Sequence, residues 1–140
     1  MIQIRPANPS DATALQELFQ RFVLEANWLP ESAKQDLDFA KASQGEKVFV
    51  AETSTREIVG LMSVWEPDGF VHTLYVSAPH QRKGIGTQLL ESLERWLPRP
   101  WRLKCVVANQ VAISFYRLHG WMPIETSTGE HGPYFLLEKQ

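Results

Sequence analysis

Residues 81–86 combine two glycines with two cationic side chains, Arg82 and Lys83. Gly84 and Gly86 stand where a strand-like run gives way to a helical pattern, and the first N–H groups of a helix point outward at the positive end of its dipole. Because neither glycine carries a side chain, an anion can approach the backbone closely. The segment is therefore a candidate phosphate-binding loop, and a helix start with an incidental second glycine is the alternative.

Two common phosphate-binding patterns do not fit this segment. The P-loop pattern fails because no Lys-Ser or Lys-Thr pair follows Gly86, and the dinucleotide pattern fails because its third glycine would be Leu89. Any phosphate bound here is therefore expected to be held in another way.

Cysteine and metal chemistry have little support in the sequence. Cys105 alternates with Leu103 and Val107 along a predicted strand, which favours a core position, and no activating base lies near it in the sequence. The four histidines show no ligand spacing with acidic partners, so no metal site is expected.

The elements that position the glycine segment form a mixed α/β pattern. Two helices are predicted near the N-terminus: one that buries Leu15, Leu18, Phe19, Phe22 and Val23, and one from about Pro30 to Ala42. Further helices are predicted from the glycines to Pro98 and over residues 111–119. Strands are predicted over residues 2–4, 48–52, 58–65, 70–76, 101–107, 121–125 and 134–139.

This order predicts a mostly antiparallel sheet of six to seven strands, flanked by about four helices. A crossover helix lies between the strands at residues 70–76 and 101–107, so these two strands are expected to be parallel neighbours.

Two blocks of the sequence resemble the GNAT superfamily of N-acetyltransferases. Gln81-Arg82-Lys83-Gly84-Ile85-Gly86 is similar to the family signature of Gln or Arg, two residues, Gly, one residue, and Gly or Ala. Asn109, Ala112, Phe115-Tyr116 and His119-Gly120-Trp121 are similar to a second family block. The order of elements also matches, so the resemblance covers nearly the whole chain and implies the GNAT fold, with a central pair of parallel strands that splay apart.

The resemblance implies an acetyl-CoA-dependent N-acetyltransferase that uses a ternary complex without a covalent intermediate. In the family, backbone amides of the glycine segment hold the diphosphate, and a strand N–H polarises the thioester carbonyl. Tyr116 is implied as the acid that protonates the departing thiolate. The cofactor-binding positions implied in this way are Leu74, Val76, Arg82, Lys83, Gly84, Ile85, Gly86, Thr87, Asn109 and Tyr116.

The base that deprotonates the amine acceptor has several candidates. His72 lies two residues before Leu74, so strand alternation places both side chains on one face, and an unperturbed histidine pKa of about 6.5 suits proton acceptance. Glu66 ends the preceding strand and is a second candidate. Glu130 and His131, in an expected loop over residues 126–133, are others. A packing or solvent-exposed role is the alternative for each of these residues.

The acceptor itself is not identified by any motif. Residues 26–44 and 126–133 are expected to line its site, and Trp28 and Trp65 are candidates for an apolar or cation-attracting acceptor pocket. Trp96, Trp101 and Trp121 are expected to pack in the core. A non-catalytic sensor of acetyl-CoA or CoA and a phosphate-binding module unrelated to CoA are the alternative functions.

Composition supports one globular domain over residues 1–140, because 44% of the residues are hydrophobic and 21% are charged. A net charge of −2 gives no general attraction to nucleic acid. The longest apolar runs have only four residues, no secretion signal is evident, and a single cysteine excludes an internal disulfide. A cytoplasmic protein is expected, without membrane or nucleic-acid partners, and a homodimer is left open.

Overall fold

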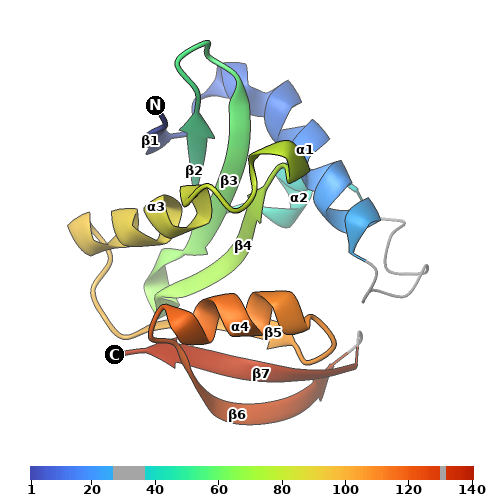
Figure 1. The fold of residues 1–140 in the computed structure, drawn as a ribbon, viewed down its shortest axis with the longest axis vertical. Helices are drawn as coiled ribbons and strands as arrows, with labels where there is room; N and C mark the ends of the chain where they lie inside the picture. Colours follow the sequence, from blue (N-terminus) through green and yellow to red (C-terminus); the bar gives the residue numbers. More distant parts are fainter. Residues whose placement is uncertain (27–36, 130–131) are drawn as a thin grey trace.

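A seven-stranded sheet in the order β1-β2-β3-β4-β5-β7-β6 carries helices on both faces (Figure 1). The structure is a computed structural model that describes residues 1–26, 37–129 and 132–140. The main elements are β1 (Gln3–Pro6), α1 (Ala12–Glu25), α2 (Phe39–Ala42), β2 (Lys47–Glu52), β3 (Ile58–Trp65), β4 (Phe70–Val76), α3 (Ile85–Glu91), β5 (Trp101–Val106), α4 (Gln110–Leu118), β6 (Met122–Gly129) and β7 (Gly132–Lys139).

Each face of the sheet has its own hydrophobic cluster. The apolar stripe of α1, predicted from its spacing, packs with Phe39 of α2 against one face, where Leu61 and Tyr75 are buried. Leucines of α3 and Ile113 of α4 pack against the opposite face. Trp101 and Trp121 are almost fully buried on that side, which confirms their predicted packing role, and Trp96 stacks on Phe49 at 5.2 Å.

The sheet divides where its two parallel strands meet. β4 and β5 are parallel neighbours, as predicted, but their ladder contains the single pair Phe70 and Arg102. The Arg102 N–H also donates to the Gly69 carbonyl at 2.9 Å. Beyond this point β5 pairs only with β7 among the described strands, so the two halves of the sheet diverge from a vertex at Gly69. Figure 1 shows β4 and β5 running apart from their shared end.

Two sequence predictions were wrong in extent. Leu37 and Asp38 are not helical, and α2 begins only at Phe39, because the Asp38 side chain caps the helix by accepting the Lys41 N–H at 3.3 Å. Residues 27–36, which include the rest of the predicted helix, lie outside the described residues.

The expected loop over residues 126–133 is mostly strand. Thr126 pairs with Phe135, Ser127 with Tyr134, and the ladder continues to Gly129 and Gly132. The β-branched threonines of this segment suit an edge strand that has a partner.

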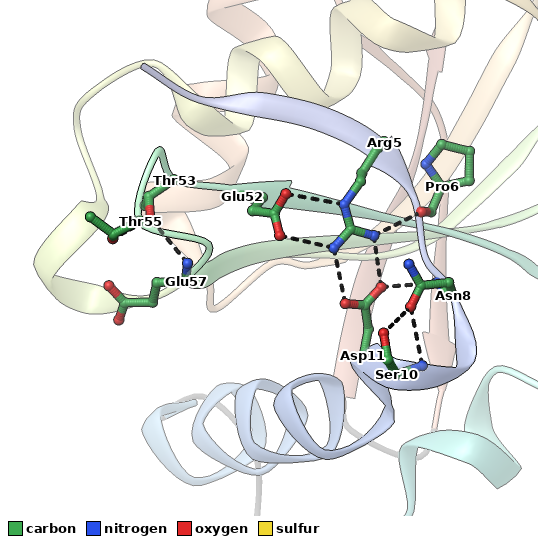
Figure 2. A network of polar contacts seen from close by, with 9 residues as sticks. All are labelled: Arg5, Pro6, Asn8, Ser10, Asp11, Glu52, Thr53, Thr55 and Glu57. Atoms are coloured by element: carbon green, nitrogen blue, oxygen red, sulfur yellow. Dashed lines mark hydrogen bonds and ion pairs between the residues drawn. The ribbon is translucent and has the colours of Figure 1, made fainter.

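A network of charged groups fixes the start of α1 (Figure 2). The Arg5 guanidinium contacts Asp11 at 2.8 Å and Glu52 at 3.1 Å, so it joins β1, the turn before α1 and the end of β2. Asp11 is almost fully buried and also accepts the Asn8 N–H at 2.8 Å. The hydrogen bonds from Arg5 lower the pKa values of both carboxylates.

Candidate functional site

A cavity of about 640 Å³ opens where β4 and β5 diverge. Its walls come from the C-terminal half of β4, the glycine segment, the first turns of α3, the helix α4 and the last turn of α1. The lining residues are Phe22, Glu25, Ala26, Leu74, Tyr75, Val76, His80, Gln81, Arg82, Gly84, Ile85, Gly86, Thr87, Asn109, Val111, Ala112, Phe115 and Tyr116.

The two glycines of the glycine segment shape the start of α3. Gly84 is the N-cap of α3 with a φ of +82°, a conformation that glycine adopts readily, and a side chain there would point into open space. A Cβ at Gly86 would lie 3.4 Å from the Phe115 ring, so glycine keeps α3 close to α4. The first N–H groups of α3 have no acceptor within the helix and are available to a ligand.

The edge of β4 presents unpaired backbone groups to the cavity. Ser77 donates its N–H to Val59 of β3 at 2.8 Å. Backbone groups of successive strand residues point to alternate sides, so the N–H groups of Leu74 and Val76 point away from β3. The Val76 carbonyl accordingly accepts from the Gln81 side chain at 2.8 Å. Because the β4–β5 ladder stops at Phe70, both N–H groups face the opening.

The side chains of Asn109 and Thr87 are engaged within the protein. Asn109 caps α4 by accepting the Ala112 N–H at 3.3 Å. Thr87 lies 2.9 Å from His119 Nε2, while His119 Nδ1 lies 2.7 Å from the Phe115 carbonyl. A carbonyl only accepts, so Nδ1 carries a hydrogen and donates it to Phe115, and Nε2 pairs with the Thr87 hydroxyl. His119 thereby joins α3 to α4.

Tyr116 contributes its ring to the cavity wall and packs edge-on against Phe115 and Trp121. Burial raises the pKa of its hydroxyl well above the ordinary value of 10.0, and the nearby Cys105 adds a smaller effect in the same direction. The hydroxyl therefore keeps its proton over the whole neutral range. It forms no hydrogen bond with another described residue, so it can donate to a bound molecule.

His72 lies on the same strand as Leu74 but is not among the residues that line the cavity. Ser63 pairs with Thr73 and Val64 pairs with Val71, so His72 forms a bulge that interrupts the alternation assumed from the sequence. Its Nδ1 lies 2.9 Å from a Glu46 carboxylate oxygen. The Glu46 side chain is 8% exposed and that of His72 is 48% exposed.

Six other predicted residues lie apart from the cavity or outside the described residues. Glu66 forms an ion pair with Lys47 at 3.0 Å, and Trp65 is 40% exposed beside the Gly45 turn. Lys83 does not line the cavity, although its neighbour Arg82 does. Trp28, like the loop candidates Glu130 and His131, lies outside the described residues.

Cys105 is buried, and burial raises the pKa of its thiol to about 11. The neutral thiol is a poor nucleophile at neutral pH. Within residues 1–26, 37–129 and 132–140, no group of three or more His, Cys, Asp and Glu side chains is arranged to hold a metal ion. None of the described helices is both long and apolar enough to span a membrane.

Sequence reasoning missed several side chains at or near the site, among them Glu25 and Tyr75 in the cavity and Glu46 beside His72. The pair Glu25 and Tyr75 is separated by 50 residues, and the pair Glu46 and His72 by 26. The strand period identifies Tyr75 as a core-facing residue, but no local pattern indicates either carboxylate partner.

A family model described as acetyltransferase (GNAT) family matches residues 12–121. The apo form of YjaB from Escherichia coli has a TM-score of 0.81 at 19% identity, with 99% of this chain and 97% of that chain covered. The putative acetyltransferase yncA from Salmonella typhimurium, solved with its cofactor acetyl-CoA, has a TM-score of 0.76 at 23% identity, with 100% and 94% covered.

Arabidopsis thaliana NAA60, in complex with a bisubstrate analogue, has a TM-score of 0.69 at 17% identity, with 99% and 97% covered. No curated protein matches the chain in sequence. The structural likenesses show a shared fold, and the predicted fold class is confirmed. Since the family model covers most of the sequence, the chain belongs to the GNAT family of acetyltransferases.

Proposed function

We propose that this protein transfers the acetyl group of acetyl-CoA directly to a primary amine in a ternary complex. The observation that carries the proposal is the diverging strand pair, which leaves the N–H groups of Leu74 and Val76 facing a cavity that ends at the glycine segment. The acetyl-CoA in the yncA structure supports the same ligand for this chain.

The cavity has complementary ends for such a ligand. The diphosphate would bind the free N–H groups at the start of α3, beside Arg82, where the helix dipole favours an anion. The pantetheine arm, which is itself an amide chain, would take the place of a strand partner along β4. One of the two free β4 N–H groups would then donate to the thioester oxygen and stabilise the tetrahedral oxyanion.

An ammonium acceptor loses two protons, one before it attacks and one as the amide forms, and the departing thiolate takes up one. The neutral amine attacks the thioester carbon, the C–S bond breaks, and the thiolate takes the proton of Tyr116. The proton that leaves the nitrogen as the amide forms passes to solvent, and Tyr116 regains a proton from solvent. His72 is the proposed base for the acceptor ammonium. In this role its Nδ1–H donates to Glu46, and the free Nε2 accepts the proton, directly or through water. Glu66 is less suited because Lys47 pairs with its carboxylate.

Gly84→Val tests the proposed phosphate site. Its matched control is Gly132→Val, because Gly132 also has a positive φ, +97°, and a side chain there would likewise meet open space, but it lies outside the cavity. Acetyl-CoA at about 100 times its Kd should stabilise the wild type by about 2.7 kcal/mol in thermal unfolding. Titration calorimetry should show acetyl-CoA binding lost in Gly84→Val and retained in Gly132→Val. A folded wild type that does not respond to acetyl-CoA would refute the proposed function.

A further inference from the structure

The cavity reaches both faces of the sheet. Leu74 packs with the cluster under α3 and α4, whereas Tyr75 packs with the cluster under α1, yet both residues line the same cavity. Phe22, Glu25 and Ala26, from the end of α1, complete the wall on the Tyr75 side. The space therefore passes through the opening between β4 and β5, and a molecule on the α1 side can approach the free N–H groups of β4.

A carboxylate is held in a fixed position on that side. The Tyr75 hydroxyl donates to Glu25 Oε1 at 2.7 Å, and the Tyr75 ring is buried against Phe22 with the ring centres 5.5 Å apart. The pKa of Tyr75 is far above its ordinary value, mainly because the side chain is buried and secondly because its hydroxyl is hydrogen-bonded to Glu25. Tyr75 therefore remains a donor, and its rigid ring orients an otherwise exposed carboxylate.

The charges in the cavity are separated along its length. Arg82 and the free amides of α3 lie at the end formed by the glycine segment, whereas Glu25 is the only acidic residue among the described lining residues. Arg21, one turn earlier on α1, affects Tyr75 electrostatically but forms no ion pair with Glu25 in the described part of the chain. One end therefore suits an anion and the other a cation.

We propose that Glu25, positioned by Tyr75, binds a second positive charge of the acceptor, so that the preferred acceptors are cationic amines such as diamines. This inference rests on the proposed acetyl transfer. The reacting amine must be neutral when it attacks, so the carboxylate pairs with the distal ammonium or guanidinium group. Phe22 and Ala26 provide apolar surface for the chain between the two nitrogens.

Matched acceptors with one reactive amine and different distal groups test the assignment. In the thiol-release assay, 1,4-diaminobutane should have a KM about tenfold below that of butylamine, and 4-aminobutanoate should be the poorest of the three. The KM values of 1,6-diaminohexane, hexylamine and 6-aminohexanoate should follow the same order. Glu25→Gln keeps the shape and the Tyr75 hydrogen bond but removes the charge. It should raise the KM of the diamines about tenfold and leave the KM of butylamine and the kcat values nearly unchanged.

Three further variants and one binding measurement separate the possible outcomes. Tyr75→Phe should raise the KM of diamines to a smaller extent and should leave the KM of butylamine unchanged. Glu17→Gln, on an exposed part of α1 outside this cavity, should behave as the wild type. The Kd of acetyl-CoA should be the same in all variants. Equal KM values for diamines and monoamines, with intact acetyl-CoA binding and turnover, would overturn this inference alone. Loss of acetyl-CoA binding in the wild type would instead overturn the proposed function.

Discussion

Burial determines what the Tyr116 hydroxyl can do. Because its raised pKa keeps the proton in place, Tyr116 should not contribute an alkaline limb to the pH profile of kcat below about pH 10. Tyr116→Phe should lower kcat about 100-fold through loss of the proton donor, while the Kd of acetyl-CoA changes little. Tyr134→Phe, outside the cavity, is the matched control and should keep wild-type turnover. Wild-type turnover in Tyr116→Phe would remove Tyr116 from the mechanism.

The contact between His72 and Glu46 leads to a prediction about the pH profile of kcat/KM. If His72 accepts the proton, kcat/KM should fall at acidic pH in the wild type, and this limb should disappear in His72→Ala. Added imidazole should partly restore turnover in that variant, which a purely structural role would not produce. Glu46→Gln should have a smaller effect, because an amide oxygen still accepts the Nδ1–H. An acidic limb that persists in His72→Ala would point to Glu66 or to water.

At the scale of elements, the sequence predicted the features that depend on residues close together in the chain. The spacing of Leu15, Leu18 and Phe19 defined α1, and β4 and β5 were correctly predicted as parallel neighbours. The bulge at His72 was not predictable, because it depends on which β3 residue pairs with which β4 residue. The continuation of β6 was likewise missed, since its strand character depends on pairing with β7.

The diverging strands predict a hydrogen-exchange pattern that alternates along β4. In the free protein the N–H groups of Leu74 and Val76 should exchange rapidly, because β5 offers them no acceptor. Acetyl-CoA should slow both by about tenfold or more. The N–H groups of Tyr75 and Ser77, which face β3, serve as internal controls and should remain protected in both states. Equal protection of all four residues in the free protein would contradict the open-edge geometry.

For the whole molecule, the Arg5 network predicts how stability depends on pH. Arg5 lowers the pKa values of Asp11 and Glu52, so their contribution is fully present above the ordinary values of 3.8 for Asp and 4.5 for Glu and is lost as the pH falls through the lower folded-state values. Asp11→Asn should reduce the free energy of unfolding by about 1 to 2 kcal/mol at pH 7, with a smaller loss at pH 3. Urea unfolding from pH 7 to pH 3 measures this difference.

Asp68→Asn, on an exposed turn, is the control for a change of one surface charge. It should leave the unfolding midpoint of the protein nearly unchanged across the same pH range. A pH-independent difference between Asp11→Asn and the wild type would show that hydrogen bonding by the residue, and not its ionisation, stabilises the start of α1.

The vertex at Gly69 has a consequence for the opposite end of the sheet. Its φ is +61°, and a Cβ there would lie 2.9 Å from the Pro100 carbonyl, so even an alanine would strain the turn and push the two half-sheets apart. Because the two half-sheets meet only near Gly69, a small rotation there produces a larger displacement at the opposite ends of β4 and β5. The width of the cavity is thus set partly at the closed end of the opening between β4 and β5, and a substitution at Gly69 should alter the affinity for acetyl-CoA without contacting it.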